Sequence, residues 1–440
     1  MSSEKVREIA NTAYLAANYR RLGLSFTPPV QSLTDVDFYM FTMGQWIHKY
    51  YPDVEVTLKL TVRDHEIPLL KYLDLDDLRR SFEYAQSLVL RKTDLYFLRG
   101  IDLYGKNMFS EEYLSFLRTL KLPSFEISTK DGLSITFKGR WPEVIFWENV
   151  GMACISELYY RGVMKDLSEG DVQSVYAVAD NRLENNLLEV KKHPEVIFSD
   201  FGQRRRHSFL WQKHVVGKAK RALPGQFSGS SNVYMAFHHD VDAKGTFAHA
   251  PTMVCTAIAK SIEEMRYAQY DVLKKWQDMH GKGLRIILPD TYGSEQFFAN
   301  APTWLLDWTG QRQDSGDPVV EIDRYISWLE EGGVDPKTKI SISSDSHTVP
   351  SMISVVDHFK GRQTIPIGWG TGLTNDFAGT LPGNQHMRPF SMVVKPHMAN
   401  GNYCVKLSND ISKATGPKKE IDRYVEIFGA QHRVTREVWS

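Results

Sequence analysis

Short apolar runs that end in glycine, serine, aspartate or threonine recur through the middle of this chain, between about residue 195 and residue 370. Helical stretches such as residues 252–280 separate these runs. Strands that alternate with helices build a parallel sheet, and seven such units predict a parallel α/β barrel. The seven predicted strands are residues 196–198, 226–229, 243–247, 285–290, 305–308, 339–344 and 365–370.

Polar, charged or glycine-rich segments follow all seven predicted strands. In α/β barrels the chemistry sits at the carboxyl ends of the strands, so we expect these segments to form one functional rim. In chain order they read S-D-F-G-Q-R-R-R, S-G-S-S-N, G-T-F-A-H, P-D-T-Y-G-S, R-Q-D-S-G-D, S-S-D-S-H and G-W-G-T-G-L-T-N-D.

A different pattern covers the region before the predicted barrel. Residues 54–62 alternate apolar and polar side chains, which predicts a half-buried strand. Residues 69–98 have helical spacing, and residues 125–137 predict a hairpin that turns at Asp131-Gly132. Together these elements indicate an N-terminal α+β domain.

The boundary between the two predicted domains falls in residues 141–160, which read as a strand that runs into a buried helix. In the tail, residues 391–395 and 403–407 alternate again and predict two antiparallel strands that return to the N-terminal domain. The predicted domains are residues 1–145 with 391–440, and the barrel, residues 146–390.

Bulk composition argues against several functional classes. The 440 residues suffice for two or three domains. Lys+Arg and Asp+Glu are both 53, whereas a protein that coats nucleic acid is normally distinctly basic. No apolar run approaches the roughly 20 residues that span a bilayer. We therefore expect neither a nucleic-acid nor a membrane partner.

Cysteine usage and the first residues predict a cytoplasmic location. Cys154, Cys255 and Cys404 lie far apart, which argues against a disulfide framework or a zinc site and suits a reducing compartment. The first ten residues, M-S-S-E-K-V-R-E-I-A, lack the apolar core of a signal peptide.

Three consecutive arginines and a histidine follow an Asp-Phe-Gly turn in residues 199–209, S-D-F-G-Q-R-R-R-H-S-F. No acid lies between Asp200 and Asp240, so these cations have no partner nearby in sequence. Arginine is well shaped to hold carboxylate and phosphate, and a strand, tight turn and helix N-terminus form a common anion site. A basic helix start that faces solvent is the alternative, but the flanking apolar runs favour a site.

Two of the other strand tips carry groups for catalysis. His249 is a candidate nucleophile or base, because imidazole titrates near neutral pH and can take a phosphoryl group. A histidine bonded to a backbone carbonyl is the alternative. Asp314 with Arg312 suits a ribose diol and a phosphate, although Asp314 could equally cap a helix.

The remaining candidates are a glycine loop and two aromatic rings. Gly370, Thr371 and Gly372 offer backbone N–H groups for a phosphate, although glycines also simply make turns. Tyr39 and Phe201 could sandwich a flat heteroaromatic substrate, although such rings are core residues in most proteins. Together these groups describe an enzyme that handles a phosphosugar or a nucleotide.

Three further acids carry no motif that separates a ligand from a helix cap. They are Asp35, Asp37 and Glu148. The chain also holds no P-loop, no H-E-x-x-H and no G-x-S-x-G sequence, which excludes the best-known nucleotide, zinc-protease and hydrolase motifs.

Six motifs in register resemble the nicotinate phosphoribosyltransferase family of pyridine-nucleotide salvage. The match runs from Asp37 to Ser408, nearly the whole chain. The resemblance implies an irregular α/β barrel with an N-terminal domain, usually in a homodimer whose partner subunit completes each site. The motifs are S-D-F-G-x-R-R-R-H-S, G-S-S-N-V, G-T-x-A-H, D-T-Y-G-S, R-x-D-S-G-D and G-x-G-T-x-L-T-N-D.

The resemblance also implies the reaction and several residue roles. Nicotinate and phosphoribosyl diphosphate would give nicotinate mononucleotide and diphosphate, with Mg²⁺, and with ATP hydrolysis coupled through a phosphorylated His249. Phe201 would stack on the pyridine ring, and Tyr39 would cover its other face from the second subunit. Arg204 and Arg312 match arginines that meet the nicotinate carboxylate or the phosphate.

Other family positions concern the ribose, the phosphate and the choice of pyridine. Asp314 matches the acid near the ribose and diphosphate, and Gly370, Thr371 and Gly372 match the loop around the 5′-phosphate. Ser231 stands where nicotinamide-using relatives carry an aspartate, which would repel a carboxylate. Serine removes that repulsion and favours nicotinate.

The sequence departs from the family pattern at three places and leaves rival functions open. Met40 replaces a common lysine, Ala250 replaces a common glutamate, and S-S-D-S-H lacks the usual glycine, which puts the contacts there in doubt. The nearest rival is a transferase for nicotinamide or quinolinate. A barrel isomerase or aldolase lacks a lysine at a strand tip, and an arginine patch for nucleic acid conflicts with the zero net charge.

Overall fold

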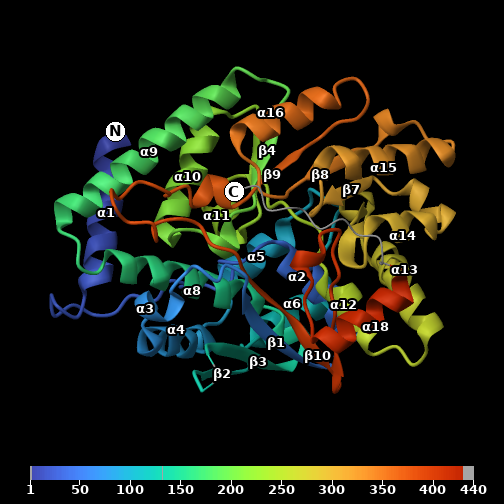
Figure 1. Cartoon of the computed structure of the whole chain (residues 1–440), viewed down its shortest axis with the longest axis horizontal. Helices are drawn as coiled ribbons and strands as arrows, with labels where there is room; N and C mark the ends of the chain where they lie inside the picture. The colour runs from blue at the N-terminus through green and yellow to red at the C-terminus, as the bar shows by residue number, and fades with distance from the viewer. Residues whose placement is uncertain (1, 131, 430–440) are drawn as a thin grey trace.

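The computed structural model describes residues 2–130 and 132–429. Two sheets organise the chain (Figure 1). A parallel sheet lies in the upper half of the view, where the helices α9 (Glu169–Lys191), α10 (Phe209–Ala222) and α15 (Pro318–Glu331) surround it, and an antiparallel sheet lies in the lower half. No helix in the described part of the chain is long and apolar enough to cross a membrane.

The upper sheet has six parallel strands in the order β5-β4-β9-β8-β7-β6. They are β4 (Phe198–Asp200), β5 (Phe227–Ser230), β6 (Ile286–Ile287), β7 (Gly310–Gln313), β8 (Ile340–Ser343) and β9 (Ile367–Trp369). The mixed α/β fold with a parallel sheet and an N-terminal α+β region is therefore confirmed. Within residues 2–130 and 132–429 the ladders do not join β5 to β6, so closure into a barrel stays a prediction.

The lower sheet is antiparallel and contains strands from both ends of the chain, in the order β11-β10-β1-β3-β2. The tail strand β10 pairs with β1 from Val56 opposite Ala399 to Val62 opposite Met392. The predicted turn between β2 and β3 falls on Asp131, outside the described residues. The domain limits at 145/146 and 390/391 stay predictions. The strands are β1 (Glu55–Val62), β2 (Ser124–Ser128), β3 (Ser134–Arg140), β10 (Met392–Ala399) and β11 (Asn402–Tyr403).

Helices fill the space between and around the two sheets. The long apolar stretch 252–280 divides into two helices, because Ser261 accepts a hydrogen bond from the backbone N–H of Glu264 and starts the second one. The other helices are α1 (Ser2–Asn18), α2 (Tyr39–Tyr50), α3 (Leu69–Tyr72), α4 (Leu75–Ser87), α5 (Lys92–Gly100), α6 (Glu111–Thr119), α7 (Trp141–Val144), α8 (Trp147–Met164), α11 (Val233–His239), α12 (Ala250–Ala257), α13 (Ile262–Met279), α14 (Ser294–Ala299), α16 (Val349–His358), α17 (Thr371–Thr374) and α18 (Lys418–Phe428).

The predicted strand at the start of residues 141–160 is wrong. The segment forms the short helix α7 and then α8. Pro142 lies in the first turn of α7, where its missing N–H costs nothing and its fixed φ favours a helix. The second part of the prediction holds, because α8 is buried along most of its length and contacts β10, α4 and the turn Gln203–Arg205.

The predicted strand at residues 305–308 is also wrong. These residues lie in the 3-10 helix Thr303–Asp307 and the residue after it, and Leu305 and Trp308 are fully buried there. The strand follows instead as β7, whose sequence G-Q-R-Q has no apolar side chain although all four residues are buried. A hydrophobic pattern cannot reveal such a strand.

The predicted strand at residues 243–247 is wrong for a different reason. Only its start pairs with β5: Ala243 forms a parallel bridge with Ser230, and the Lys244 N–H donates to the Ser230 carbonyl at 2.9 Å. Further along the segment, helix α2 provides the hydrogen-bond partners instead. The Thr42 hydroxyl donates to the Thr246 carbonyl, and the Ala248 N–H donates to the Met43 sulfur at 3.2 Å. The N-terminal helix therefore fixes the loop that leads to His249.

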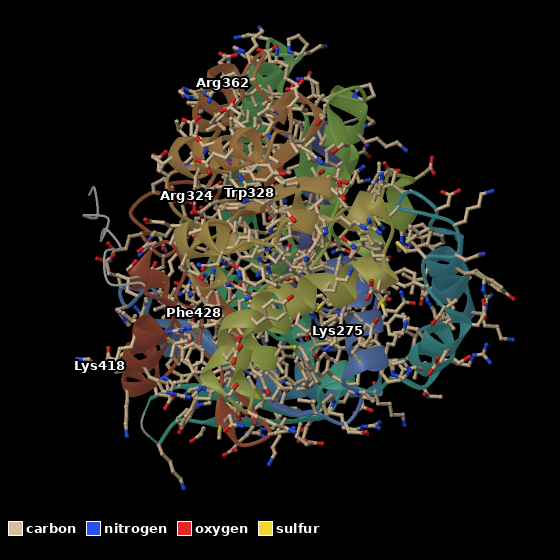
Figure 2. All side chains as sticks on the ribbon, turned by 90° about the vertical axis from the view of Figure 1, so that its right-hand side faces the viewer. Lys275, Arg324, Trp328, Arg362, Lys418 and Phe428 are labelled. Carbon is tan, nitrogen blue, oxygen red and sulfur yellow. The ribbon has the colours of Figure 1, made fainter. Side chains whose placement is uncertain are left out.

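The tail of the chain also supports the rim of the parallel sheet. Helix α18, which carries Lys418 and Phe428 (Figure 2), packs beside α13. The Phe428 ring stacks on Tyr292 with the ring centroids 4.1 Å apart. The Leu407 N–H donates to the Thr291 carbonyl at 2.9 Å. The segment after β6 is thus held by the C-terminal tail.

Candidate active site

The candidate residues lie at the carboxyl ends of the parallel strands, as α/β folds lead one to expect. Side chains from the N-terminal region and from the tail cover this edge. They form two clusters, one around His249 and one around Arg204.

His249 is buried at the start of α12 and contacts three polar side chains. Its Nδ1 lies 3.0 Å from the Thr291 hydroxyl, and its Nε2 lies 3.0 Å from Asp314 Oδ2 and 3.7 Å from Asp290 Oδ1. Burial, helped by the charge of Lys406, lowers the pKa of His249 to about 4, although both aspartates oppose the shift. The ring is therefore neutral at pH 7 and keeps a lone pair for a phosphoryl group or a proton.

Asp290 and Asp314 flank this histidine as charged carboxylates. Burial alone would raise the pKa of Asp314, but Arg312 and His249 outweigh it and hold that pKa well below its ordinary value. For Asp290, burial likewise opposes ionisation, and Lys406 reverses the balance to lower the pKa. Asp290 Oδ2 accepts from Ser315 at 2.6 Å and from Lys406 at 3.3 Å.

The His249 cluster has the ligand types for a divalent cation. Single ligand atoms of His249, Asp290 and Asp314 all lie within 4.8 Å of one another. Asp290 Oδ1 is buried and has no hydrogen-bond partner in the part of the chain that the structure describes. The two carboxylates offer the hard oxygen ligands that Mg²⁺ prefers, so the residues present fit that ion.

Arg204 is the centre of the second cluster and lies in the turn Gln203–Arg205 after β4. Its Nη1 is 3.3 Å from Glu148 Oε1, and its Nε is 3.7 Å from Asp37 Oδ2. The guanidinium carbon lies 5.9 Å from the centre of the Tyr39 ring. Tyr39 thus contacts Arg204 of its own chain, and its role in a second subunit's site stays a prediction.

The neighbours of Arg204 in the arginine run differ from it. Arg206 is fully buried and forms a bidentate pair with Asp35, at 2.5 and 2.7 Å. His207 is also buried and stacks on Phe377, with the ring centroids 3.6 Å apart. Burial, with help from Arg204, lowers the pKa of Arg205 to about 10. None of the three arginines is exposed, so the alternative of a basic helix start in solvent is wrong.

Ser231 is buried after β5, and its hydroxyl donates to Asp37 Oδ1 at 2.6 Å. Burial raises the pKa of Asp37 to about 6, and Arg204 and Ser231 oppose the shift. An acid, Asp37 from the N-terminal segment, therefore lies beside Ser231. Whether this position repels a substrate carboxylate, as an aspartate in place of Ser231 would, depends on the protonation of Asp37.

Phe201 and the glycine loop lie together at the tips of β4 and β9. The Phe201 N–H donates to the Trp369 carbonyl at 2.9 Å, and a Cβ at Gly368 would lie 2.5 Å from the Phe201 ring. Glycine is therefore required beneath this ring. Gly370, Thr371 and Gly372 are all partly exposed.

The loop after β9 approaches the loop after β8 closely. A Cβ at Gly372 would lie 2.7 Å from the His347 carbonyl, so this approach also needs glycine. Ser344 links the loop after β8 to the other cluster, because its hydroxyl donates to Asp314 Oδ1 at 3.2 Å. Arg312 Nε lies 3.8 Å from the same carboxylate.

Sequence reasoning missed three residues of these clusters, Asp290, Lys395 and Lys406, and named Glu148 without assigning it a role. Asp290 lies in the D-T-Y-G-S tip and could have been found as an acid after a predicted strand. Lys395 and Lys406 are charged residues inside apolar tail strands, which is a weaker signal. Glu148 had no signal beyond an acid at the start of a buried helix.

A parallel sheet with charged side chains and a glycine loop at its carboxyl edge is an arrangement typical of α/β enzymes. The N-terminal-domain model of the nicotinate phosphoribosyltransferase (NAPRTase) family matches residues 34–156, and the model of the family itself matches residues 196–432. The chain belongs to the nicotinate phosphoribosyltransferase family, which confirms the resemblance seen in its motifs.

Solved structures agree with this assignment. A nicotinate phosphoribosyltransferase from Porphyromonas gingivalis is 28% identical with a TM-score of 0.79, and the match covers 91% of this chain and 100% of that one. One from Vibrio cholerae is 27% identical with a TM-score of 0.81, covering 91% and 94%. A putative nicotinate phosphoribosyltransferase from Saccharomyces cerevisiae is 25% identical with a TM-score of 0.78, covering 92% and 99%.

Proposed function

We propose that the protein makes nicotinate mononucleotide and diphosphate from nicotinate and phosphoribosyl diphosphate, and that it couples this transfer to ATP hydrolysis through a phosphorylated His249. The carrying observation is the buried, neutral His249 between Asp290 and Asp314, at the same strand edge as Phe201 and Arg204. A neutral imidazole that faces two carboxylates can accept a phosphoryl group and be stabilised by neighbouring cations.

The transfer itself needs positioning more than covalent catalysis. The anomeric carbon loses diphosphate, and the pyridine nitrogen attacks it. Phe201 offers a ring for stacking, and Arg204 offers a partly exposed guanidinium for the nicotinate carboxylate. Arg312 and the loop Gly370-Thr371-Gly372 are assigned to phosphate groups, where fixed donors stabilise developing charge.

Asp290 and Asp314 would hold Mg²⁺ in this scheme. The ion, when bound, supplies positive charge to the diphosphate that leaves. Neighbouring residues would position the two carboxylates. Lys406 neutralises the charge of Asp290, and Ser344 and Arg312 orient Asp314.

The observation of Asp37 beside Ser231 favours one rival substrate, nicotinamide. An ionised Asp37 would accept a hydrogen bond from a carboxamide and repel a carboxylate, whereas a protonated Asp37 would not repel nicotinate. Rates with nicotinate, nicotinamide and quinolinate at one pH separate these activities. A homodimer, implied by the family resemblance, and a cytoplasmic location, favoured by the sparse cysteines, are part of the proposal.

His249→Ala tests the coupling. We expect slow transfer that no longer depends on ATP, because the site for pyridine and phosphoribosyl diphosphate remains while the phosphoryl acceptor is gone. The measurement is the number of ATP molecules hydrolysed for each nicotinate mononucleotide formed. An unchanged ratio in this variant would contradict the role of His249.

A further inference from the structure

Glu148 is a buried acid that collects donors from three separate parts of the chain. It lies in the first turn of α8 and is fully buried. Its Oε1 accepts from Lys395 of β10 at 3.0 Å, from Arg204 at 3.3 Å and from the Tyr39 hydroxyl of α2 at 3.3 Å. One oxygen atom thus joins the N-terminal region, the tail and the strand tip that carries Arg204.

The charges around Glu148 balance only while it is ionised. Burial disfavours its charge, but Lys395 and Arg204 outweigh burial, and the pKa of Glu148 is lowered. Lys395 is itself buried, and burial lowers its pKa while Glu148 opposes the shift. A neutral side chain in place of Glu148 would leave two neighbouring cations to repel each other in a site of low dielectric.

Acidic side chains contact two of the three guanidinium nitrogens of Arg204. Glu148 engages Nη1, and Asp37 lies nearest to Nε. Within the described ranges, Nη2 makes no hydrogen bond, and the side chain keeps 28% of its accessible surface. A planar guanidinium whose Nη1 and Nε nitrogens are contacted presents its Nη2 nitrogen in a defined direction.

We propose that Glu148 is a positioning residue that fixes Arg204 through Nη1, so that its Nη2 nitrogen is preorganised to bind the anionic group of the substrate. This inference rests on the proposed function for the identity of the anion, nicotinate or diphosphate. Glu148 does not itself touch the substrate, because its carboxylate is buried behind Arg204, Lys395 and Tyr39.

Helix α8 supplies a matched control in Glu157. This acid is also buried on α8, and it also holds an arginine, Arg161, at 2.6 Å. Its other oxygen accepts from the Phe209 N–H at 2.8 Å. Both Gln variants remove a buried charge from the same helix, but only Glu148 contacts Arg204.

The test is the equilibrium affinity for two probes, nicotinate and inorganic diphosphate, measured by titration calorimetry on folded variants. We expect Glu148→Gln to weaken at least one affinity by about tenfold to a hundredfold, the effect of losing a charged hydrogen bond. In turnover assays KM should rise while kcat changes much less. Glu157→Gln should bind both probes within about twofold of the wild type.

A double-mutant cycle distinguishes positioning from general damage. In an Arg204→Gln background, Glu148→Gln should have little further effect on affinity, because the group through which it acts is gone. The inference would be overturned if the two substitutions weakened the affinity by independent factors that multiply in the double variant. It would also be overturned if a stable Glu148→Gln protein bound both probes with unchanged affinity. If Glu148→Gln does not fold, Glu148→Asp keeps the charge with a shorter reach, and wild-type affinity in that variant would also overturn it.

Failure of the proposed function gives a separate result. A wild-type protein that forms no mononucleotide from any pyridine would refute that function. The diphosphate titration would still test Glu148, because it measures binding of an anion and needs no turnover.

Discussion

Arg204 and Arg206 stand two residues apart in one basic run, yet the fold uses them in opposite ways. Arg206 is fully buried and closes a bidentate pair with Asp35 at 2.5 and 2.7 Å. Arg204 is held more loosely by Glu148 at 3.3 Å and keeps 28% of its surface exposed. The comparison teaches that a fully buried guanidinium paired with a carboxylate supports the fold, while a partly exposed one is available to a ligand.

The largest effect should come from breaking the buried ion pair between Arg206 and Asp35. Arg206→Met leaves Asp35 charged and buried without its partner, so we expect it to lower the free energy of unfolding by about 3–5 kcal/mol. Urea unfolding measures this loss. Arg206→Met with Asp35→Leu should regain most of it, because both charges are then gone. A single variant as stable as the wild type would refute the structural role of Arg206.

The pH dependence of stability extends the comparison to His249, another buried group. Its pKa is about 4 in the folded protein and about 6.5 when unfolded, so between these values only the unfolded chain binds the proton. Stability should therefore fall as the pH drops from 6.5 towards 4, by up to about 3 kcal/mol from this group.

The difference between wild type and His249→Gln reports this contribution together with its coupling to Asp290 and Asp314, because groups that do not interact with His249 titrate equally in both. The variant should gain stability relative to the wild type as the pH falls through this window. A constant difference from pH 7 to pH 4 would show that His249 is not held neutral by the fold.

Arg204→Gln should sharpen the contrast with Arg206. We expect KM for nicotinate to rise about tenfold to a hundredfold, as for loss of a charged hydrogen bond. The loss of unfolding free energy should be smaller than in Arg206→Met, because Lys395 still balances Glu148. Steady-state kinetics and urea unfolding of the same preparation measure both. The reverse pattern, lost stability with unchanged KM, would contradict the division of roles.

The smallest predicted effect concerns Asp37 beside Arg204. Its pKa of about 6 means that it is largely protonated below pH 6 and charged above it. Nicotinate affinity should therefore fall several-fold as the pH rises through 6, because the charged acid competes for Arg204. Asp37→Asn should bind nicotinate with a flatter pH profile. Identical profiles for variant and wild type would exclude this effect.

The sequence predicted the parallel sheet and the residues at its tips because apolar strands with polar ends leave a clear pattern. It failed at β7, where Gln311 and Gln313 are buried and donate to or accept from Ser341 and Ser343 of β8. The buried amide and hydroxyl groups of the two strands form hydrogen bonds with one another, so the strand can be buried without apolar side chains. A hydrophobic pattern therefore does not reveal it.

The site was predicted as a set of residue types but not as two clusters. The local sequence does not predict that Arg204 pairs with Glu148 and Arg206 with Asp35, because these partners lie 56 and 171 residues away along the chain. Long-range pairing of charges follows from the packing of α8 and the N-terminal segment against the strand tips. That packing is a property of the whole fold.

The most direct test of the account is product formation by the purified protein with nicotinate, phosphoribosyl diphosphate, Mg²⁺ and ATP. We predict nicotinate mononucleotide as the product, faster turnover when ATP is present, and little product when nicotinamide replaces nicotinate. Formation of nicotinamide mononucleotide instead, or of no nucleotide from any of the three pyridines, would contradict it.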